Sequence, residues 1–414
     1  KNGDSCYTPA WVKQELKRFR RAQFEPGRNG RNVSPFSFAC RDADARAFAA
    51  LMRFLEENDR QHTVVMVQVE NEVGNLRSPR DVSAAAEAAF TCLVPVALMK
   101  HLKVHRERLI PALRAAWEGA GMHESGTWPE VFGGLADEVF MAWHIARYVN
   151  HVAAAGKAEY PLPMFVNAWL DYGAAGPGHY PSGGPVFRVH DVWRAAAPSL
   201  DALAPDIYHP DFKTACRDYT QGDNPLIIPE ANGPGAEANV FWAVAEHNAL
   251  CFSPFGIDSP HPWGPKHPWE VPKLPAGYRL LGEMIPFLGD HLGTPRLRGL
   301  CQTSDEKETL DLGDYRIEIT YANKLADGKG PGYGLIVAVQ PHEFVIAGSG
   351  FMAGFGPKPG GLPNADFILL EEGRFVKGKW MAGRRLNGDD TGAYSANLLD
   401  PEPGIRRAVL YSHE

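Results

Sequence analysis

The stretch Thr63–Gly74, TVVMVQVENEVG, carries the strongest structural and chemical signal in this chain. It opens with the apolar, β-branched run Val64–Val67, which is typical of a strand buried on both faces of a parallel sheet or barrel. Two glutamates and an amide follow at Glu70–Glu72, and Gly74 then lets the chain turn. Because the carboxyl ends of the strands carry the chemistry in (β/α)8 enzymes, this pattern predicts a catalytic strand. An acidic N-cap for the next helix is an equally open interpretation of these residues alone.

Composition and charge narrow the class of protein. The chain has 414 residues, more than one compact core usually holds, so two domains are expected. A formal net charge of −7 argues against nucleic-acid binding, which requires basic surfaces. No apolar run reaches the length of about 18 residues that a membrane span needs. The six cysteines show none of the spacings of a zinc site, so isolated thiols are predicted and no metal is.

Strand and helix patterns alternate along the first 292 residues. Four further apolar segments end in polar or aromatic residues, as the first one does: Pro163–Leu170, Leu203–His209, Pro225–Asn232 and Ala249–Ser253. Helical patterns precede and separate the apolar segments, among them Val12–Arg21, Asp42–Glu57, Leu98–Trp117 and Leu135–Ala155. Such alternation is typical of βαβ units and of a parallel sheet. We therefore predict a catalytic α/β domain over residues 1–292.

The pattern changes after Gly293-Thr294-Pro295, which has the composition of a linker. Short alternating segments now follow one another, separated by turns such as Asn387-Gly388-Asp389. The expected strands are Arg316–Tyr321, Gly334–Gln340, Glu343–Ala347, Phe367–Glu371 and Gly404–Tyr411. This part of the chain is predicted to form an all-β, sandwich-like domain over residues 296–414.

Two carboxylates stand at predicted strand ends without a local structural reason. Glu72 is the first, and Glu230 is the second, delivered by the run Pro225–Pro229 before Asn232-Gly233 turns the chain away. Two carboxylates that flank one bond are the arrangement that glycoside hydrolysis requires, one as acid and then base, the other as nucleophile or activator of water. Asn71 could bond a sugar hydroxyl beside them. Glu70 is an alternative acid, and a structural supporting role is the interpretation we favour for it.

Several segments carry a resemblance to a known family. Val67–Gly74, VQVENEVG, resembles the acid/base strand of glycoside hydrolase family 35, which usually has Tyr in place of Val73. Lys1–Lys13, KNGDSCYTPAWVK, resembles the segment that follows the third barrel strand in bacterial members. Phe344–Phe351, FVIAGSGF, resembles the C-terminal β-domain of a bacterial branch of β-galactosidases. The resemblance implies a retaining, exo-acting β-galactosidase without a cofactor, and it implies that Glu72 is the acid/base, Glu230 the nucleophile and Asn71 a ligand of the sugar 2-hydroxyl.

The same resemblance implies a truncated barrel. Aligned in this way, Thr63–Glu72 is strand four, and the later apolar segments are strands five to eight. Strands one to three are missing, which corresponds to roughly 90 residues upstream of Lys1. We therefore expect a (β/α)8 barrel that lacks roughly its first three strands, as in a fragment or the product of a split gene. An open sheet of this kind should expose apolar edges and be unstable alone. An aromatic residue expected two positions after the nucleophile is also missing, since position 232 is Asn.

Four other residues are candidates for substrate contacts, each with a structural alternative. Asn167 could bond a sugar hydroxyl or hold a loop. Tyr208 could orient the nucleophile through its hydroxyl or be a core tyrosine. Trp263 and Trp269 could stack on sugar faces or stiffen a proline-rich loop. Asp206, just before Tyr208, is expected to be structural.

The function that the resemblance implies is hydrolysis of terminal β-galactosyl residues from oligo- or polysaccharides, with plant cell-wall side chains as a substrate by analogy. Another retaining β-glycosidase, or an inactive, sugar-binding remnant, are the alternatives. The partner is thus a carbohydrate, with neither nucleic acid nor a membrane span expected. A periplasmic or secreted location follows from the habit of the family, with any signal peptide upstream of Lys1.

Overall fold

The computed structural model describes residues 7–233, 235–257, 273–391 and 395–414, and they form a mixed α/β fold with parallel strands and several antiparallel sheets. The chain divides into two compact units, Lys1–Pro229 and Glu230–Glu414. The predicted boundary at residues 293–295 is a different division and stays a prediction. Among the described residues, no helix combines the length and the apolar character needed to cross a membrane.

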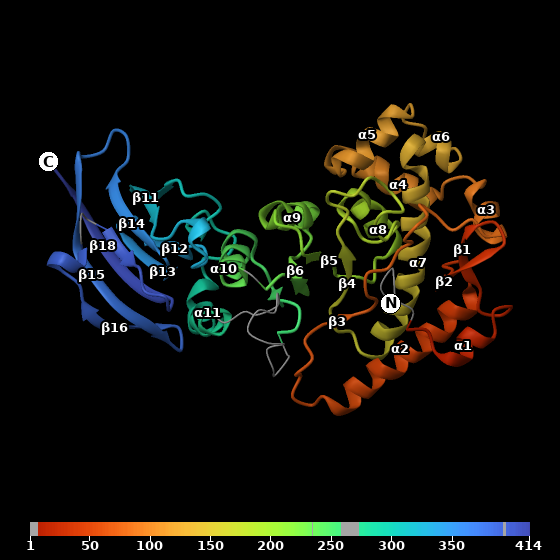
Figure 1. Ribbon diagram of the computed structural model, residues 1–414, viewed down its shortest axis with the longest axis horizontal. Helices are drawn as coiled ribbons and strands as arrows, with labels where there is room; N and C mark the ends of the chain where they lie inside the picture. The colour runs from red at the N-terminus through yellow and green to blue at the C-terminus, as the bar shows by residue number, and fades with distance from the viewer. Residues whose placement is uncertain (1–6, 234, 258–272, 392–394) are drawn as a thin grey trace. The chain divides into compact units, whose positions relative to one another are not determined.

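The first unit contains three parallel strands, in the order β3-β4-β5 (Figure 1). Their bounds are Val67–Gln68, Met164–Trp169 and Ala202–Ile207. Val67 pairs with Met164, and Phe165 pairs with Ala202. The parallel α/β character expected from the alternating patterns is confirmed, whereas a complete (β/α)8 barrel remains a prediction.

The prediction that Thr63–Glu72 is a strand buried on both faces is wrong. Only Val67 and Gln68 pair as a strand, and the side chain of Val65 is 64% exposed. The reason is position, because β3 is the edge strand of its sheet and β4 covers one side of it. An apolar run predicts burial only where neighbours lie on both sides.

Most helices of the first unit lie on the α7 side of the parallel strands, and α9 lies on the other side (Figure 1). They are α1 (Ala10–Gln14), α2 (Phe38–Asn58), α3 (Ala84–Phe90), α4 (Val96–Val104), α5 (Pro111–Gly119), α6 (Trp128–Phe132), α7 (Ala136–Glu159), α8 (His190–Ala196) and α9 (Phe212–Tyr219). Helix α7 is buried along most of its length, and α2 packs against it through Phe48 and Met52. Gly156 of α7 makes this close approach possible, since an added Cβ would lie 2.3 Å from the Phe48 ring.

Two helix predictions need correction. The predicted helix Val12–Arg21 is α1, which ends at Gln14, and Arg21 begins an antiparallel hairpin of β1 (Arg21–Glu25) and β2 (Arg28–Val33). The predicted helix Leu98–Trp117 is broken between α4 and α5, because Pro111 disfavours helical geometry in the residue before it and opens a new helix.

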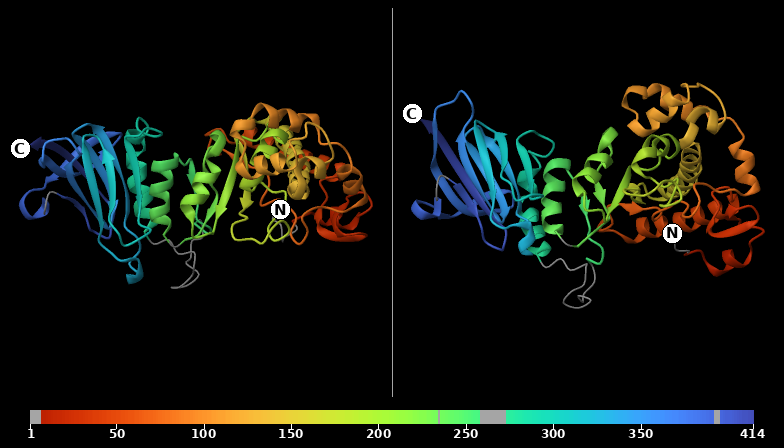
Figure 2. Two further views of the ribbon diagram at one scale, coloured as in Figure 1. Left: turned by 90° about the horizontal axis from the view of Figure 1, so that it is seen from above. Right: turned by 45° about the horizontal axis from the view of Figure 1, so that its top comes forward.

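The second unit is dominated by antiparallel strands in two stacked layers, drawn in cyan and blue (Figure 2). A four-stranded sheet has the order β10-β11-β14-β17, and a six-stranded sheet has the order β16-β15-β18-β13-β12-β9. The elements of this unit are β7 (Glu230–Ala231), α10 (Ala236–His247), β8 (Cys251–Phe252), α11 (Leu274–Leu288), β9 (Leu297–Cys301), β10 (Glu308–Leu312), β11 (Tyr315–Tyr321), β12 (Tyr333–Gln340), β13 (Glu343–Ser349), β14 (Phe351–Pro357), β15 (Asn364–Val376), β16 (Lys379–Arg385), β17 (Ser395–Leu398) and β18 (Gly404–His413). Apolar side chains from both sheets, including Ile317 and Phe344, share one core. From Leu297 onward the described elements are strands and short 3-10 turns.

Candidate active site

The chain leaves strand β3 through an acidic turn. Glu72 adopts a left-handed backbone conformation with φ of 41°, which is unusual for a residue other than glycine. Its backbone N–H donates a 2.8 Å hydrogen bond to Oδ1 of Asn167, a residue of the neighbouring strand β4. A local signal could not provide this bond, because it joins residues that only the parallel pairing of β3 and β4 brings together.

Asn167 is fully buried and all of its hydrogen-bonding capacity is used within the protein. Oδ1 accepts from Glu72 N and, at 3.1 Å, from Nε2 of Gln68. Nδ2 donates to Oδ1 of Asn71 at 2.9 Å and to Oδ2 of Asp206 at 2.7 Å. Of the two roles considered for Asn167, these four bonds favour holding the loop over binding a sugar hydroxyl.

Asn71 is held by two neighbours at once. Its Oδ1 accepts from Asn167 and also from Gln68 Nε2, at 2.9 Å. Because both bonds go to the oxygen, the Nδ2 group is the part of Asn71 that can donate to a ligand. The side chain is therefore prepared to bond an acceptor such as a sugar hydroxyl oxygen.

A second carboxylate lies next to Glu72 in this unit. Asp206 of β5 is 2% exposed, and a carboxylate oxygen of Asp206 lies within 4.8 Å of one of Glu72. Asn167 donates to Asp206 and accepts from Glu72 N, so it links Asp206 to the acidic turn. The parallel pairing of β3, β4 and β5 thus brings Glu72, the amide of Asn71 and the buried carboxylate of Asp206 together at the carboxyl ends of these strands.

The other predicted site residues lie at different places. Tyr208 is partly buried and directly follows β5. Glu230 begins β7, as the first residue of the second unit, and is also partly buried. Trp263 and Trp269 lie outside the described residues, so their predicted stacking role stays a prediction.

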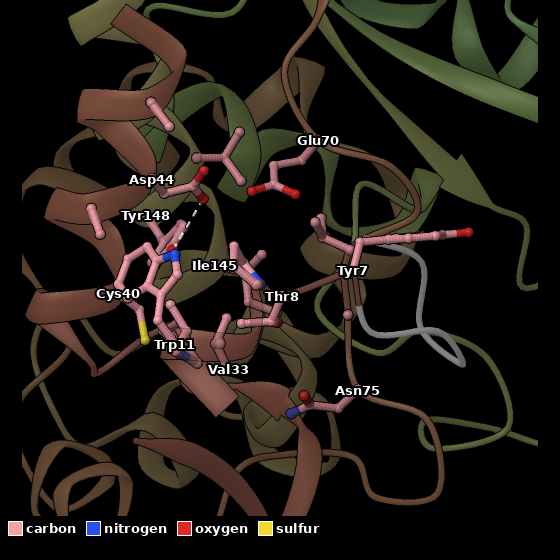
Figure 3. Close-up of a pocket in the computed structure, with 18 residues that line it drawn as sticks. Tyr7, Thr8, Trp11, Val33, Cys40, Asp44, Glu70, Asn75, Ile145 and Tyr148 are labelled. Carbon is pink, nitrogen blue, oxygen red and sulfur yellow. Dashed lines mark hydrogen bonds between the residues drawn. The ribbon is translucent and has the colours of Figure 1, made fainter. Parts of the chain in front are cut away.

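Glu70 faces a separate cavity of about 290 Å³ (Figure 3). The cavity is lined by residues 7–12, by α2 and α7, and by the loop after β3. Across it, the carboxylates of Glu70 and Asp44 point toward each other, and Tyr148 donates a 3.1 Å hydrogen bond to Asp44 (Figure 3). Burial is the main cause that raises the pKa of Tyr148, so its phenol keeps its proton. Glu70 therefore belongs to this cavity, whereas Asn71 and Glu72 belong to the Asn167 network.

Sequence reasoning missed Gln68 as a member of the network and treated Asp206 only as structural. Gln68 was hidden by its place inside an apolar strand pattern. Asp206 did leave a signal, since it is a lone charge within the apolar segment Leu203–Ile207. A charge in a buried strand is costly unless it is hydrogen-bonded, so such a residue predicts a polar partner on a neighbouring strand.

One family model matches part of this chain. Residues 274–396 match the family "Domain of unknown function (DUF5597)", which covers a segment of the second unit. No curated protein matches the chain.

Among solved structures, a Paenibacillus polymyxa xyloglucanase from glycoside hydrolase family 44 is similar over 69% of this chain, with 11% sequence identity and a TM-score of 0.26. The similarity covers 64% of that enzyme, which is less than two thirds of its length.

Proposed function

We propose that this protein is a retaining, exo-acting β-galactosidase in which Glu72 is the acid/base and Glu230 the nucleophile. One observation carries the proposal: the Asn71–Glu72 pair is fixed by buried Asn167 at the carboxyl end of the parallel strand β3. That is the end of a parallel α/β sheet at which catalytic residues are found. The resemblance of Val67–Gly74 to the acid/base strand of glycoside hydrolase family 35 supplies the sugar and the role of Glu230.

The reaction needs two steps. In the first, the Glu230 carboxylate attacks the anomeric carbon while Glu72 gives its proton to the departing oxygen, so the glycosidic bond breaks and a glycosyl ester forms. In the second, Glu72 takes a proton from water while the water oxygen attacks the anomeric carbon. The ester bond to Glu230 breaks, and Glu230 leaves as a carboxylate. Asn71 Nδ2 would donate to the sugar 2-hydroxyl, whose bonds strengthen in the transition state. No cofactor takes part.

Proton NMR during turnover tests this proposal directly. Nitrophenyl β-galactoside should release galactose first as the β-anomer, because two inversions restore the configuration. Glu230→Ala should lower turnover by at least about 10⁴-fold because it removes the nucleophile. Glu124→Ala is the matched control, since this glutamate is 77% exposed and distant in sequence. Release of the α-anomer, or binding of galactosides without any turnover by the wild type, would contradict the proposal. A preference for glucosides, mannosides or arabinosides would keep the mechanism and change the sugar.

A further inference from the structure

We propose that Asp206 and Asn167 form a positioning relay that fixes the acidic turn, so that Asp206 orients Glu72 without touching the substrate. This inference rests on the proposed function for its catalytic consequence. Its structural part stands on the hydrogen bonds among β3, β4 and β5.

The direction of each hydrogen bond fixes the orientation of the Asn167 amide. The backbone N–H of Glu72 can only donate, so the atom that faces it must be Oδ1. Oδ2 of Asp206 accepts the second hydrogen bond, so the atom that faces it is Nδ2. The two neighbours therefore demand the same orientation, and rotating the amide by 180° would break both bonds. Asp206 thus acts as a lock on the side chain that holds Glu72.

The turn needs such a lock because its backbone is strained. A left-handed conformation is unfavourable for a side-chain-bearing residue and persists only where the surroundings hold it. For Glu72, the hydrogen bond from its N–H to a fully buried amide provides that hold. The same amide fixes Asn71 through Nδ2, so the direction of two adjacent site residues depends on one orientation.

Loss of the relay should affect proton donation more than binding. Proton transfer to the leaving oxygen requires Glu72 at hydrogen-bonding distance, and a small displacement removes most of its benefit. A substrate whose leaving group departs without a proton should be much less sensitive. The relay therefore predicts a loss of kcat for poor leaving groups, with KM nearly unchanged.

An exchange of chemical groups across the relay gives the sharpest test. Asn167→Asp alone places two carboxylates against each other, and we expect kcat/KM on alkyl β-galactosides to fall about 100-fold. On dinitrophenyl β-galactoside, the loss should be less than about tenfold. Adding Asp206→Asn restores a donor facing an acceptor between positions 206 and 167, whereas the bond from position 167 to Asn71 stays lost. The double variant should therefore recover part of the loss, at least about tenfold over Asn167→Asp. Asn150→Ala is the matched control, because Asn150 also accepts from a backbone N–H, at 2.9 Å from Ser199 N, away from the site.

A second measurement separates this inference from the proposed function. Amide hydrogen exchange by NMR reports the Glu72 N–H directly, whether or not the protein turns over a galactoside. Exchange at Glu72 should be about tenfold faster in Asn167→Asp than in the wild type and slow again in the double variant. Asn150→Ala should leave it unchanged. The relay would be overturned if the Glu72 N–H exchanged as fast in the double variant as in Asn167→Asp. It would also be overturned if exchange in every variant were as slow as in the wild type. An inactive wild type with the expected exchange pattern would contradict only the proposed activity.

Discussion

Glu138 is a carboxyl group enclosed in the first unit. It is 0% exposed on helix α7, where its Oε2 accepts from the Tyr180 hydroxyl at 2.6 Å and its Oε1 from Gly183 N at 2.9 Å. Burial raises the pKa of Glu138 to about 7, and these two hydrogen bonds oppose part of that rise. The carboxyl therefore gains a proton in the folded protein at a pH where the unfolded chain has lost it.

This shift predicts a pH dependence of stability. Between about pH 4.5 and 7 the folded protein binds the Glu138 proton and the unfolded chain does not, so the free energy of unfolding falls as pH rises. The full loss attributable to this group is about 3 kcal/mol. Urea unfolding at pH 5 and pH 7.5 should show most of that loss in the wild type but not in Glu138→Gln, which has no proton to lose. Equal pH dependence in both proteins would show that Glu138 is ionised when folded.

At the scale of single residues, the sequence predicts the reactive side chains better than those that hold them. Glu72 and Asn71 stand out because polar residues follow an apolar run. Asp206 and Gln68 do not, because their roles depend on bonds to Asn167 that cross three strands. No local pattern encodes such bonds, since their partners are 39 and 99 residues away.

The packing of helix α2 on α7 gives a prediction at the scale of elements. Gly156→Ala should destabilise the protein by about 1–3 kcal/mol, because the new Cβ would overlap the Phe48 ring and crowd Met52. Gly282→Ala is the matched control: it lies inside α11, where a Cβ would meet nothing within 4 Å. That change should stabilise by about 0.5–1 kcal/mol through helix propensity. Denaturant unfolding measures both, and a neutral Gly156→Ala would mean that the helices lie farther apart.

Helices and strands were predictable where a periodic hydrophobic pattern was bounded by residues that end such elements. The predicted helix Leu135–Ala155 corresponds to α7, and the predicted strands Gly334–Gln340 and Glu343–Ala347 to β12 and β13. The predictions failed where context decides, since β3 is shortened by its place at a sheet edge. The hairpin of β1 and β2 was missed because its strands are polar and partly exposed.

At the scale of the whole molecule, the sequence predicts the change from parallel α/β structure to antiparallel strands, because hydrophobic period and turn spacing both change. It does not define which residues far apart in the chain act together. We propose Glu72 as the acid/base and Glu230 as the nucleophile, and double displacement requires two such carboxylates about 5–5.5 Å apart. The central claim is therefore that these two residues act on one bond from opposite sides.

Azide rescue tests that claim most directly. Glu72→Ala should retain most of its first-step rate on dinitrophenyl β-galactoside, whose leaving group needs no proton, but should stall at the glycosyl ester because the base is missing. Azide needs no base, so it should restore turnover and yield β-galactosyl azide, whose configuration the anomeric proton signal reports by NMR. Glu230→Ala should show no such product in the β-configuration. Formation of an α-galactosyl azide by Glu72→Ala would contradict the roles assigned to Glu72 and Glu230. The same conclusion would follow if azide did not rescue Glu72→Ala and this variant lost activity equally on alkyl and dinitrophenyl galactosides.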